Sequence, residues 1–286
     1  MYRLAELRVT RVRYLWLTIV LALIAGLTIT LITSPSEAKT RTGTATAARP
    51  TVVLVNGAWA NSASWSGVIE RLQTEGYTVD APPNPLQSLK GDAATIADLL
   101  KTIKGPIVLV GHSYGGAVIT NAATGNRNVK ALVYVDAFAP AKGESALGLD
   151  SSKPGSALAA GPTKVFNFVP FPGAKKGDAL LYVKPSVFEQ AFANGLPAKE
   201  GAVLAATQAP VTYSAVTTPS GTPAWKTIPS WYVLGTIDEA IPPDVQLFMA
   251  RRIHAHITRV RAGHLSMVAA PGVVAKVITA AANATS

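Results

Sequence analysis

The 286-residue chain contains no cysteine, only four histidines and only three methionines. The absence of cysteine excludes disulfides, thiolate metal ligands and a lipid-modified cysteine anchor. Acidic residues are also few, 16 against 26 basic ones, which gives a formal net charge of +10. The basic residues form no dense run interleaved with aromatic residues, so the sequence does not predict nucleic-acid binding. Because histidines are so few, each can be weighed in turn as a general base.

The first 38 residues have the pattern of a targeting segment. Arg11 and Arg13 precede an uncharged apolar run from Tyr14 to Ile32, and Ser36-Glu37-Ala38 then forms a small-x-Ala cleavage pattern. The run is long enough to span a bilayer, so a cleaved signal peptide and an uncleaved membrane anchor both stay open. We favour export with cleavage, which would place the protein outside the cytoplasmic membrane, secreted or anchored. The composition of residues 39–50 predicts a flexible linker.

The most informative stretch runs from Pro106 to Gly116. Ile107 to Val110 are apolar and mostly β-branched, which predicts a buried strand. Gly111-His112-Ser113-Tyr114-Gly115 follows as a G-x-S-x-G match, and the Ala-rich segment from Gly116 to Thr124 predicts a helix. A strand, a tight turn and a helix form the context in which a nucleophilic serine is held on a strained turn. Ser113 is therefore the predicted nucleophile.

Strands and helices are predicted to alternate along residues 51–286. This pattern predicts an α/β fold with a mostly parallel sheet and helices on both faces. Residues 140–227 interrupt the alternation with a loop-rich segment, which predicts a cap insertion within the same domain. The predicted strands are 51–55, 77–81, 107–110, 131–135, 230–234 and 256–260, and the predicted helices are 62–75, one capped by Asp92, 116–124, 242–253 and one beginning at Pro271.

His264 is the histidine best placed to act as the base. It lies between the last predicted strand and the last predicted helix, at the carboxyl end of the sheet, where open α/β sheets carry their sites. His112 precedes the nucleophile, but the turn directs it away from the serine oxygen. His254 and His256 have the spacing of metal ligands, yet no acidic cluster accompanies them, so no metal site is predicted.

The acid that orients the base is expected at another strand end. Asp238 follows the strand 230–234, and the order Ser113, Asp238, His264 is that of the hydrolase fold. Asp136 ends the preceding strand and stays open as an alternative, whereas Glu239 would face differently. The oxyanion donors are expected to be the amide of Tyr114 and the amide of Ala58 in the loop after the first strand.

With these motifs in place, the chain resembles the α/β-hydrolase superfamily. It looks most like the small group that includes plant methyl-salicylate esterases, hydroxynitrile lyases and many bacterial esterases, over Thr51 to Ala281. The resemblance implies the α/β-hydrolase fold and esterase chemistry. The residues that carry it are Leu54-Val55-Asn56-Gly57-Ala58, Trp65, Gly111-His112-Ser113-Tyr114-Gly115-Gly116, Gly235-Thr236-Ile237-Asp238 and Gly263-His264.

Three positions refine the resemblance. The family usually has His-Gly in the oxyanion loop, whereas this chain has Asn56-Gly57, which we interpret as a structural substitution. Hydroxynitrile lyases usually carry Thr at the position of Gly57 and Lys at the position of Leu265, so these two residues favour the esterases. Dehalogenases and epoxide hydrolases of this fold use an Asp nucleophile, which Ser113 argues against.

We therefore predict an exported serine hydrolase that cleaves small carboxylic esters through an acyl-enzyme, with no metal or organic cofactor. A hydrolase-like receptor that binds a ligand without turnover, and a lyase or acyltransferase on the same scaffold, stay open as alternatives. Because the base must be neutral, the rate should fall at acid pH. The aromatic residues predicted to bind substrate are Trp59, Phe166, Phe168, Tyr182, Phe188 and Trp225.

Overall fold

The structure, a computed structural model, describes residues 49–285. The predicted signal or anchor over 1–38 and nearly all of the predicted linker lie outside these residues, so export stays a prediction. Across 49–285, no helix has both the length and the apolar character needed to cross a bilayer.

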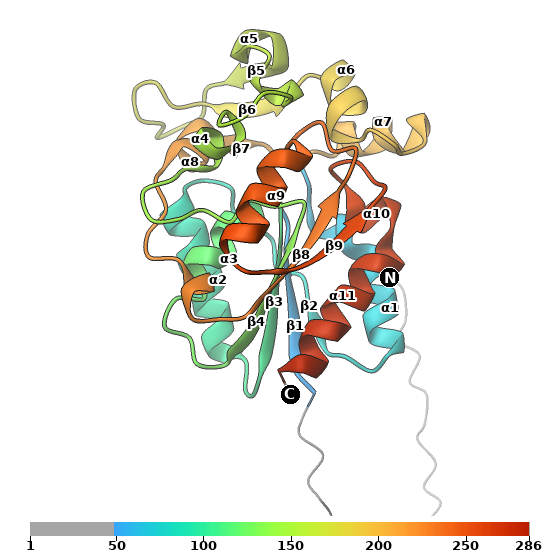
Figure 1. Cartoon of the computed structure of the whole chain (residues 1–286). Helices are drawn as coiled ribbons and strands as arrows, with labels where there is room; N and C mark the ends of the chain where they lie inside the picture. Colours follow the sequence, from blue (N-terminus) through green and yellow to red (C-terminus); the bar gives the residue numbers. More distant parts are fainter. Residues whose placement is uncertain (1–48, 286) are drawn as a thin grey trace, which may run out of the picture. The chain divides into compact units, whose positions relative to one another are not determined.

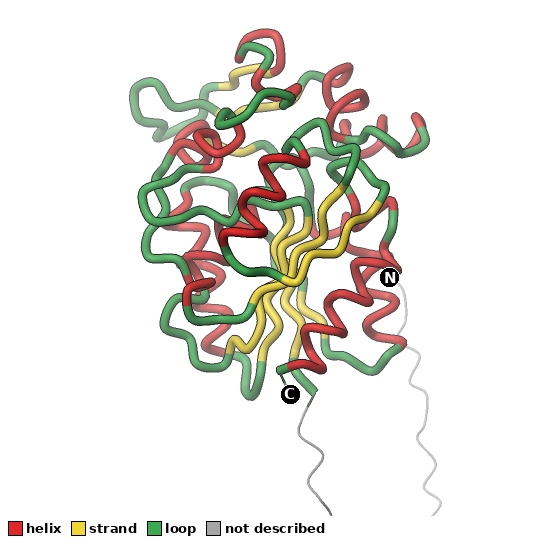
Figure 2. Tube along the Cα trace, in the orientation of Figure 1, coloured by secondary structure: helices red, strands yellow, loops and turns green. Residues whose placement is uncertain are grey.

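Six strands form a parallel sheet in the order β2-β1-β3-β4-β8-β9 (Figures 1 and 2). The central strands are buried on both faces, which explains why their sequences are continuous apolar runs rather than alternating ones. The predicted α/β architecture is confirmed. The strands are β1 (Thr51–Val55), β2 (Val79–Asp80), β3 (Ile107–His112), β4 (Val129–Val135), β8 (Ser230–Gly235) and β9 (His256–Val260).

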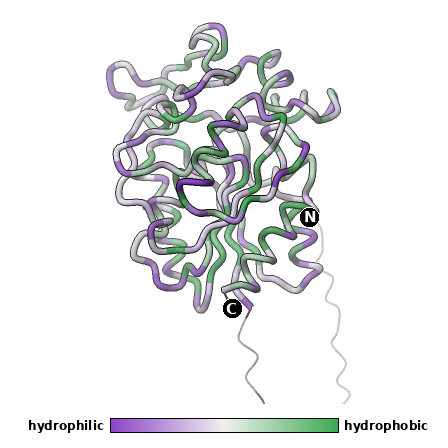
Figure 3. Tube along the Cα trace, viewed as in Figure 1, coloured by the Kyte–Doolittle hydropathy of each residue, from purple (hydrophilic) through white to green (hydrophobic). Residues whose placement is uncertain are grey.

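Helices cover both faces of this sheet. In Figure 1, α1 (Ser66–Thr74) and α11 (Pro271–Ala284) lie on one side, and α2 (Leu89–Thr102) and α3 (Tyr114–Ala122) lie on the other. Apolar residues follow the strands and α11 (Figure 3), as expected of a core between the layers. Two further helices complete this part, α9 (Pro243–Arg252) and the short α10 (Ser266–Ala269).

The start of α2 differs from the sequence prediction. Its N-cap is Ser88, whose side chain accepts a hydrogen bond from the Gly91 amide at 3.1 Å. Asp92 lies inside the first turn, where its carboxyl group accepts from the amide of Gln87 and from the hydroxyl of Tyr114. The prediction that Asp92 caps the helix is therefore wrong, because Ser88 supplies the cap one turn earlier and Asp92 is buried.

The segment between β4 and β8 forms a cap, which Figure 1 shows above the carboxyl ends of the parallel strands. It contains a small antiparallel sheet of order β5-β6-β7 and five short helices. The Trp59 indole joins the cap to the body by donating to the Leu181 carbonyl at 2.8 Å. The cap elements are α4 (Ala146–Asp150), α5 (Pro162–Val165), β5 (Phe166–Val169), β6 (Leu180–Val183), α6 (Pro185–Val187), α7 (Ala198–Ala206), β7 (Val211–Thr212) and α8 (Tyr213–Thr217).

Candidate active site

Ser113 occupies a sharp turn between β3 and α3. Its backbone has φ 51° and ψ −124°, a conformation that costs a residue with a side chain about 1–3 kcal/mol. Glycines make the turn sterically feasible: a Cβ on Gly111 would lie 2.6 Å from the Gly115 carbonyl oxygen, and a Cβ on Gly115 would lie 2.5 Å from the Val55 carbonyl oxygen. The strained turn predicted from the sequence is present.

The three predicted catalytic side chains meet at the carboxyl ends of β3, β8 and β9. The Ser113 hydroxyl oxygen lies 2.9 Å from His264 Nε2, and His264 Nδ1 lies 2.8 Å from Asp238 Oδ2. All three residues are buried, and none exposes more than 3% of its surface. A hydroxyl, an imidazole and a carboxylate in this order form an arrangement that can move a proton off the serine.

Asp238 is held by donors from its own loop and from α9. Its Oδ1 accepts hydrogen bonds from the amides of Ala240 at 2.8 Å and Ile241 at 2.9 Å. Its Oδ2 accepts from the Gln246 side-chain amide at 2.7 Å as well as from His264. Burial raises the pKa of the Asp238 carboxyl, and these hydrogen bonds oppose that rise by stabilising the charged form. Sequence reasoning missed Gln246, since no motif marks it.

Asp136, the alternative acid, makes different contacts. Its carboxyl oxygens accept from the Gly235 amide at 2.8 Å and from the Ser266 amide at 3.0 Å. It therefore ties the end of β8 to α10, and the hydrogen bond to His264 comes from Asp238. Glu239, the other alternative, is exposed to solvent. Of the three carboxyl groups considered from the sequence, Asp238 is the one that the structure joins to His264.

The electrostatic state of His264 suits a base. Burial lowers the pKa of its imidazole below the ordinary value, so the ring is neutral at neutral pH. His112 lies beside it, with the two ring centroids 4.8 Å apart. Burial, together with His264 itself, keeps the pKa of His112 well below its usual range, so neutral His112 donates from Nε2 to the His264 carbonyl oxygen at 2.9 Å. His112 thus positions the loop that carries His264.

The other two histidines lie away from this site. His256, on the edge strand β9, stacks on Trp231 with ring centroids 5.0 Å apart. His254 follows α9 with a positive φ of 53°. Across residues 49–285, no three side chains of His, Asp or Glu come together in a group that could hold a metal ion.

The loop after β1 packs directly against the nucleophile. A Cβ on Gly57 would lie 2.5 Å from the Cβ of Ser113, so only glycine lets the loop approach this closely. The Asn56 side chain shapes the loop by donating to the carbonyl oxygens of Gly57 and Ala60, each at 3.0 Å. Ala58 and Tyr114, the predicted oxyanion donors, both line the cavity that contains Ser113.

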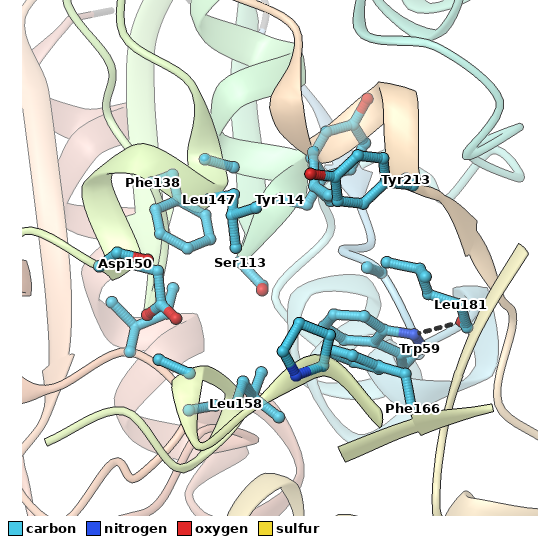
Figure 4. Close-up of a pocket in the computed structure, with 18 of the residues that line it drawn as sticks. Trp59, Ser113, Tyr114, Phe138, Leu147, Asp150, Leu158, Phe166, Leu181 and Tyr213 are labelled. Atoms are coloured by element: carbon cyan, nitrogen blue, oxygen red, sulfur yellow. Dashed lines mark hydrogen bonds between the residues drawn. The ribbon is translucent and has the colours of Figure 1, made fainter. Parts of the chain in front are cut away.

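Ser113 opens into an apolar cavity of about 230 Å³ beneath the cap (Figure 4). Of the six aromatic residues predicted to bind substrate, Trp59, Phe166 and Phe168 line it. Trp59 stacks on Phe166 with centroids 5.4 Å apart and forms one wall. Sequence reasoning missed many of the lining residues, among them Phe138, Leu147, Asp150, Leu158, Leu181 and Tyr213.

The other three predicted aromatic residues lie outside the cavity. Tyr182 follows Leu181 on β6, and since side chains alternate along a strand, Leu181 faces the cavity and Tyr182 faces away. Phe188 is buried against Phe192, with ring centroids 4.7 Å apart. The Trp225 indole donates to the Pro140 carbonyl oxygen at 3.0 Å, and the Arg252 guanidinium lies 6.0 Å from its ring centroid. None of the three lines the Ser113 cavity, in contrast to the prediction that they bind substrate in an apolar pocket there.

Comparison with known proteins identifies the family to which this chain belongs. A model of the alpha/beta hydrolase family matches residues 52–277. The chain belongs to the alpha/beta hydrolase family. The resemblance and the fold class predicted from the sequence motifs are thereby confirmed, and the hydrolases among its relatives support the predicted hydrolase-type enzyme.

Three relatives illustrate what this alpha/beta hydrolase is similar to. The alpha/beta hydrolase nvfD of Aspergillus novofumigatus (strain IBT 16806) is 28% identical over 257 residues, covering 82% of this chain and 97% of that protein. The carbendazim hydrolyzing esterase of Nocardioides sp. (strain SG-4G) is 33% identical over 110 residues, or 34% of this chain and 46% of that protein. An extracellular alpha/beta-hydrolase from a Paenibacillus species has the same fold, with a TM-score of 0.63, 21% identity and coverage of 81% of this chain and 98% of that one.

Proposed function

We propose that this alpha/beta hydrolase cleaves small carboxylic esters through an acyl-enzyme intermediate. The observation that carries the proposal is the hydrogen-bonded series Ser113–His264–Asp238 at the wall of an apolar cavity. The similarity to a carbendazim hydrolyzing esterase supports ester cleavage as the reaction.

The first half of the reaction acylates Ser113. Its hydroxyl oxygen attacks the acyl carbon while its proton passes to His264 Nε2, and Asp238 stabilises the imidazolium that forms. The amides of Ala58 and Tyr114 donate to the oxyanion of the tetrahedral intermediate. When the intermediate collapses, the carbon–oxygen bond to the alcohol breaks and the imidazolium returns the proton to that leaving oxygen.

The second half releases the acid. A water molecule takes the place of the alcohol, gives its proton to His264 and attacks the acyl carbon of the Ser113 ester. The same donors stabilise the second oxyanion, and collapse returns the proton to Ser113. The net reaction consumes one water and produces one alcohol and one carboxylic acid.

The cavity supports small, uncharged esters as the substrate class. Its lining within residues 49–285 is mostly apolar and includes neither Lys nor Arg that could bind a phosphate or carboxylate. A cavity of about 230 Å³ suits a short or medium acyl group, or the methyl ester of an aromatic acid.

We expect nitrophenyl esters of short and medium acyl chains to be the best substrates of a chain-length series. The physical reason is that a long chain would extend past the Trp59–Phe166 wall and lose contact with the enclosed part of the cavity. The measurement is kcat/KM for each ester. Activation at a lipid interface with a preference for long chains would contradict this prediction and indicate a lipase.

We expect kcat/KM to fall at acid pH with a midpoint below about 6.5, the ordinary histidine value. The base accepts a proton only when His264 is neutral, and burial lowers its pKa, so the loss shifts to lower pH. The profile is measured on a neutral ester, with circular dichroism at each pH to verify folding. An acid limb centred above about 6.5 would argue against a buried neutral histidine as the base.

A further inference from the structure

Asp150, the last residue of α4, places a carboxyl group in the mostly apolar wall of the Ser113 cavity. Only 5% of its surface is exposed. Its Oδ1 is buried and has no hydrogen-bond partner among residues 49–285. A buried polar atom without a partner is uncommon and costly in a folded protein, so this oxygen requires an explanation. Nothing in the proposed acylation and deacylation steps uses it.

The other carboxyl oxygen belongs to a short hydrogen-bonded series. Asp150 Oδ2 lies 2.7 Å from the Ser156 hydroxyl oxygen, which also lies 2.8 Å from the Ala240 carbonyl oxygen. The serine hydroxyl has one proton, and the carbonyl oxygen can only accept. Both contacts are satisfied together when Asp150 carries a proton on Oδ2, donates it to Ser156, and Ser156 donates to Ala240. Oδ1 is then a carbonyl oxygen that accepts a hydrogen bond.

The charges around Asp150 agree with this arrangement. Burial, with a smaller contribution from the negative charge of Asp238, raises the pKa of its carboxyl group to about 7, against the effect of the Ser156 hydrogen bond. No Lys or Arg among residues 49–285 lines the cavity to stabilise a carboxylate there. The neutral acid is therefore well populated near neutral pH.

We infer that Asp150 is a specificity residue whose Oδ1 accepts a hydrogen bond from an N–H or O–H group of the ester substrate. This inference rests on the proposed esterase function. In Figure 4 the Ser113 hydroxyl lies between the Asp150 carboxyl group and the Trp59 ring, so the donor belongs to the part of the substrate on the Asp150 side. A substrate without the donor leaves Oδ1 buried and unpaired, which a site discriminates against strongly.

The test uses matched aromatic esters that differ in one hydrogen-bond donor. Nitrophenyl esters of ortho-, meta- and para-hydroxybenzoic acid are compared with the corresponding methoxybenzoates, and acetates of hydroxybenzyl alcohols with those of methoxybenzyl alcohols. The two series scan the acyl and alcohol halves at three distances each. We expect the wild-type protein to prefer the hydroxy ester in kcat/KM by about tenfold or more at one position.

Two variants separate hydrogen bonding from shape. In Asp150→Asn, the amide can donate to Ser156 and keep its Oδ1 as an acceptor, as the neutral acid does, so the preference should persist. In Asp150→Leu, the acceptor is replaced by a side chain of similar size, and the ratio of the two rates should fall to about one. The unsubstituted benzoate is the reference ester: its kcat/KM is measured in the wild-type protein and in both variants, and the hydroxy preference is compared as a ratio to it, so that a general change in rate cancels.

The outcomes discriminate clearly. A wild-type protein that hydrolyses the benzoate but shows no hydroxy preference in either series would overturn the inference and leave the proposed function standing. A hydroxy preference that survives in Asp150→Leu would overturn the inference as well.

A preference for cationic aminomethyl esters that is lost in Asp150→Asn would show that Asp150 binds the substrate as a charged carboxylate. That result would overturn the proposal that Asp150 is a neutral hydrogen-bond acceptor. Absence of all ester turnover by the wild-type protein would reject the esterase function itself. The wild-type comparison needs no variant, so a variant that misfolds does not remove the test.

Discussion

Ser113→Ala should abolish ester hydrolysis while leaving the protein folded. The substitution removes one oxygen atom, whose hydrogen-bond partner is His264 Nε2. Alanine has nearly the same backbone preferences as serine, so the cost of the positive φ at this turn hardly changes. Removing the nucleophile of such a triad lowers kcat by about 10⁶-fold, since the steps that depend on it act as a unit.

The measurement is kcat on a nitrophenyl ester, together with covalent labelling by a fluorophosphonate probe and a thermal unfolding curve. Ser66→Ala is a matched control, because Ser66 is exposed and begins α1, which lies on the face of the sheet opposite α3 (Figure 1). The control should retain turnover and labelling, whereas Ser113→Ala should lose both. Turnover near the wild-type rate in a folded Ser113→Ala protein would reject the nucleophile. Absence of labelling in the folded wild-type protein would favour a ligand-binding role.

Asp238→Asn should lower kcat by about 10⁴-fold. It should also lower the stability, because the new NH₂ group faces the Gln246 side-chain amide that donates to Asp238 Oδ2. The asparagine oxygen can still accept from the Ala240 and Ile241 amides, as Asp238 Oδ1 does. The atom facing His264 Nδ1 then becomes an NH₂ group, which donates to Nδ1 and leaves the proton on Nε2. An imidazole protonated at Nε2 cannot accept the proton of Ser113, so the base is lost although its position is kept.

Asp136→Asn is the matched comparison, because Asp136 is equally buried and was the alternative acid. Its two carboxyl oxygens accept from the Gly235 and Ser266 amides, and an asparagine can serve only one of them. We expect a loss of about 1–3 kcal/mol in the free energy of unfolding, measured with urea, and a much smaller loss in kcat. A larger loss of kcat in Asp136→Asn than in Asp238→Asn would assign the acid to Asp136 instead.

Patterns of contiguous residues were sufficient to predict much of the site. The strand, the G-x-S-x-G turn and the helix around Ser113 are neighbours in the chain, and their local preferences suffice to predict the strained turn. His264 and Asp238 could be placed because each follows a strand, and parallel strands bring their carboxyl ends to one edge. The helix cap at Ser88 was missed because Ser88 and Asp92 are both capable of capping, and only the burial of Asp92 distinguishes them.

The sequence by itself determined the fold class and pointed to Ser113, His264 and Asp238 as the candidate nucleophile, base and acid, because each depends on short-range patterns or on strand ends. The tertiary structure alone decided which residues line the Ser113 cavity. Tyr182 is as aromatic as Phe166, yet the pairing of β6 with β5 turns Leu181 toward the cavity and Tyr182 away from it. No motif marks Asp150. Its carboxyl group contacts the Ser156 hydroxyl, which in turn contacts the carbonyl oxygen of Ala240, 84 residues further along the chain. Contacts across such separations are set by packing, which no local pattern records.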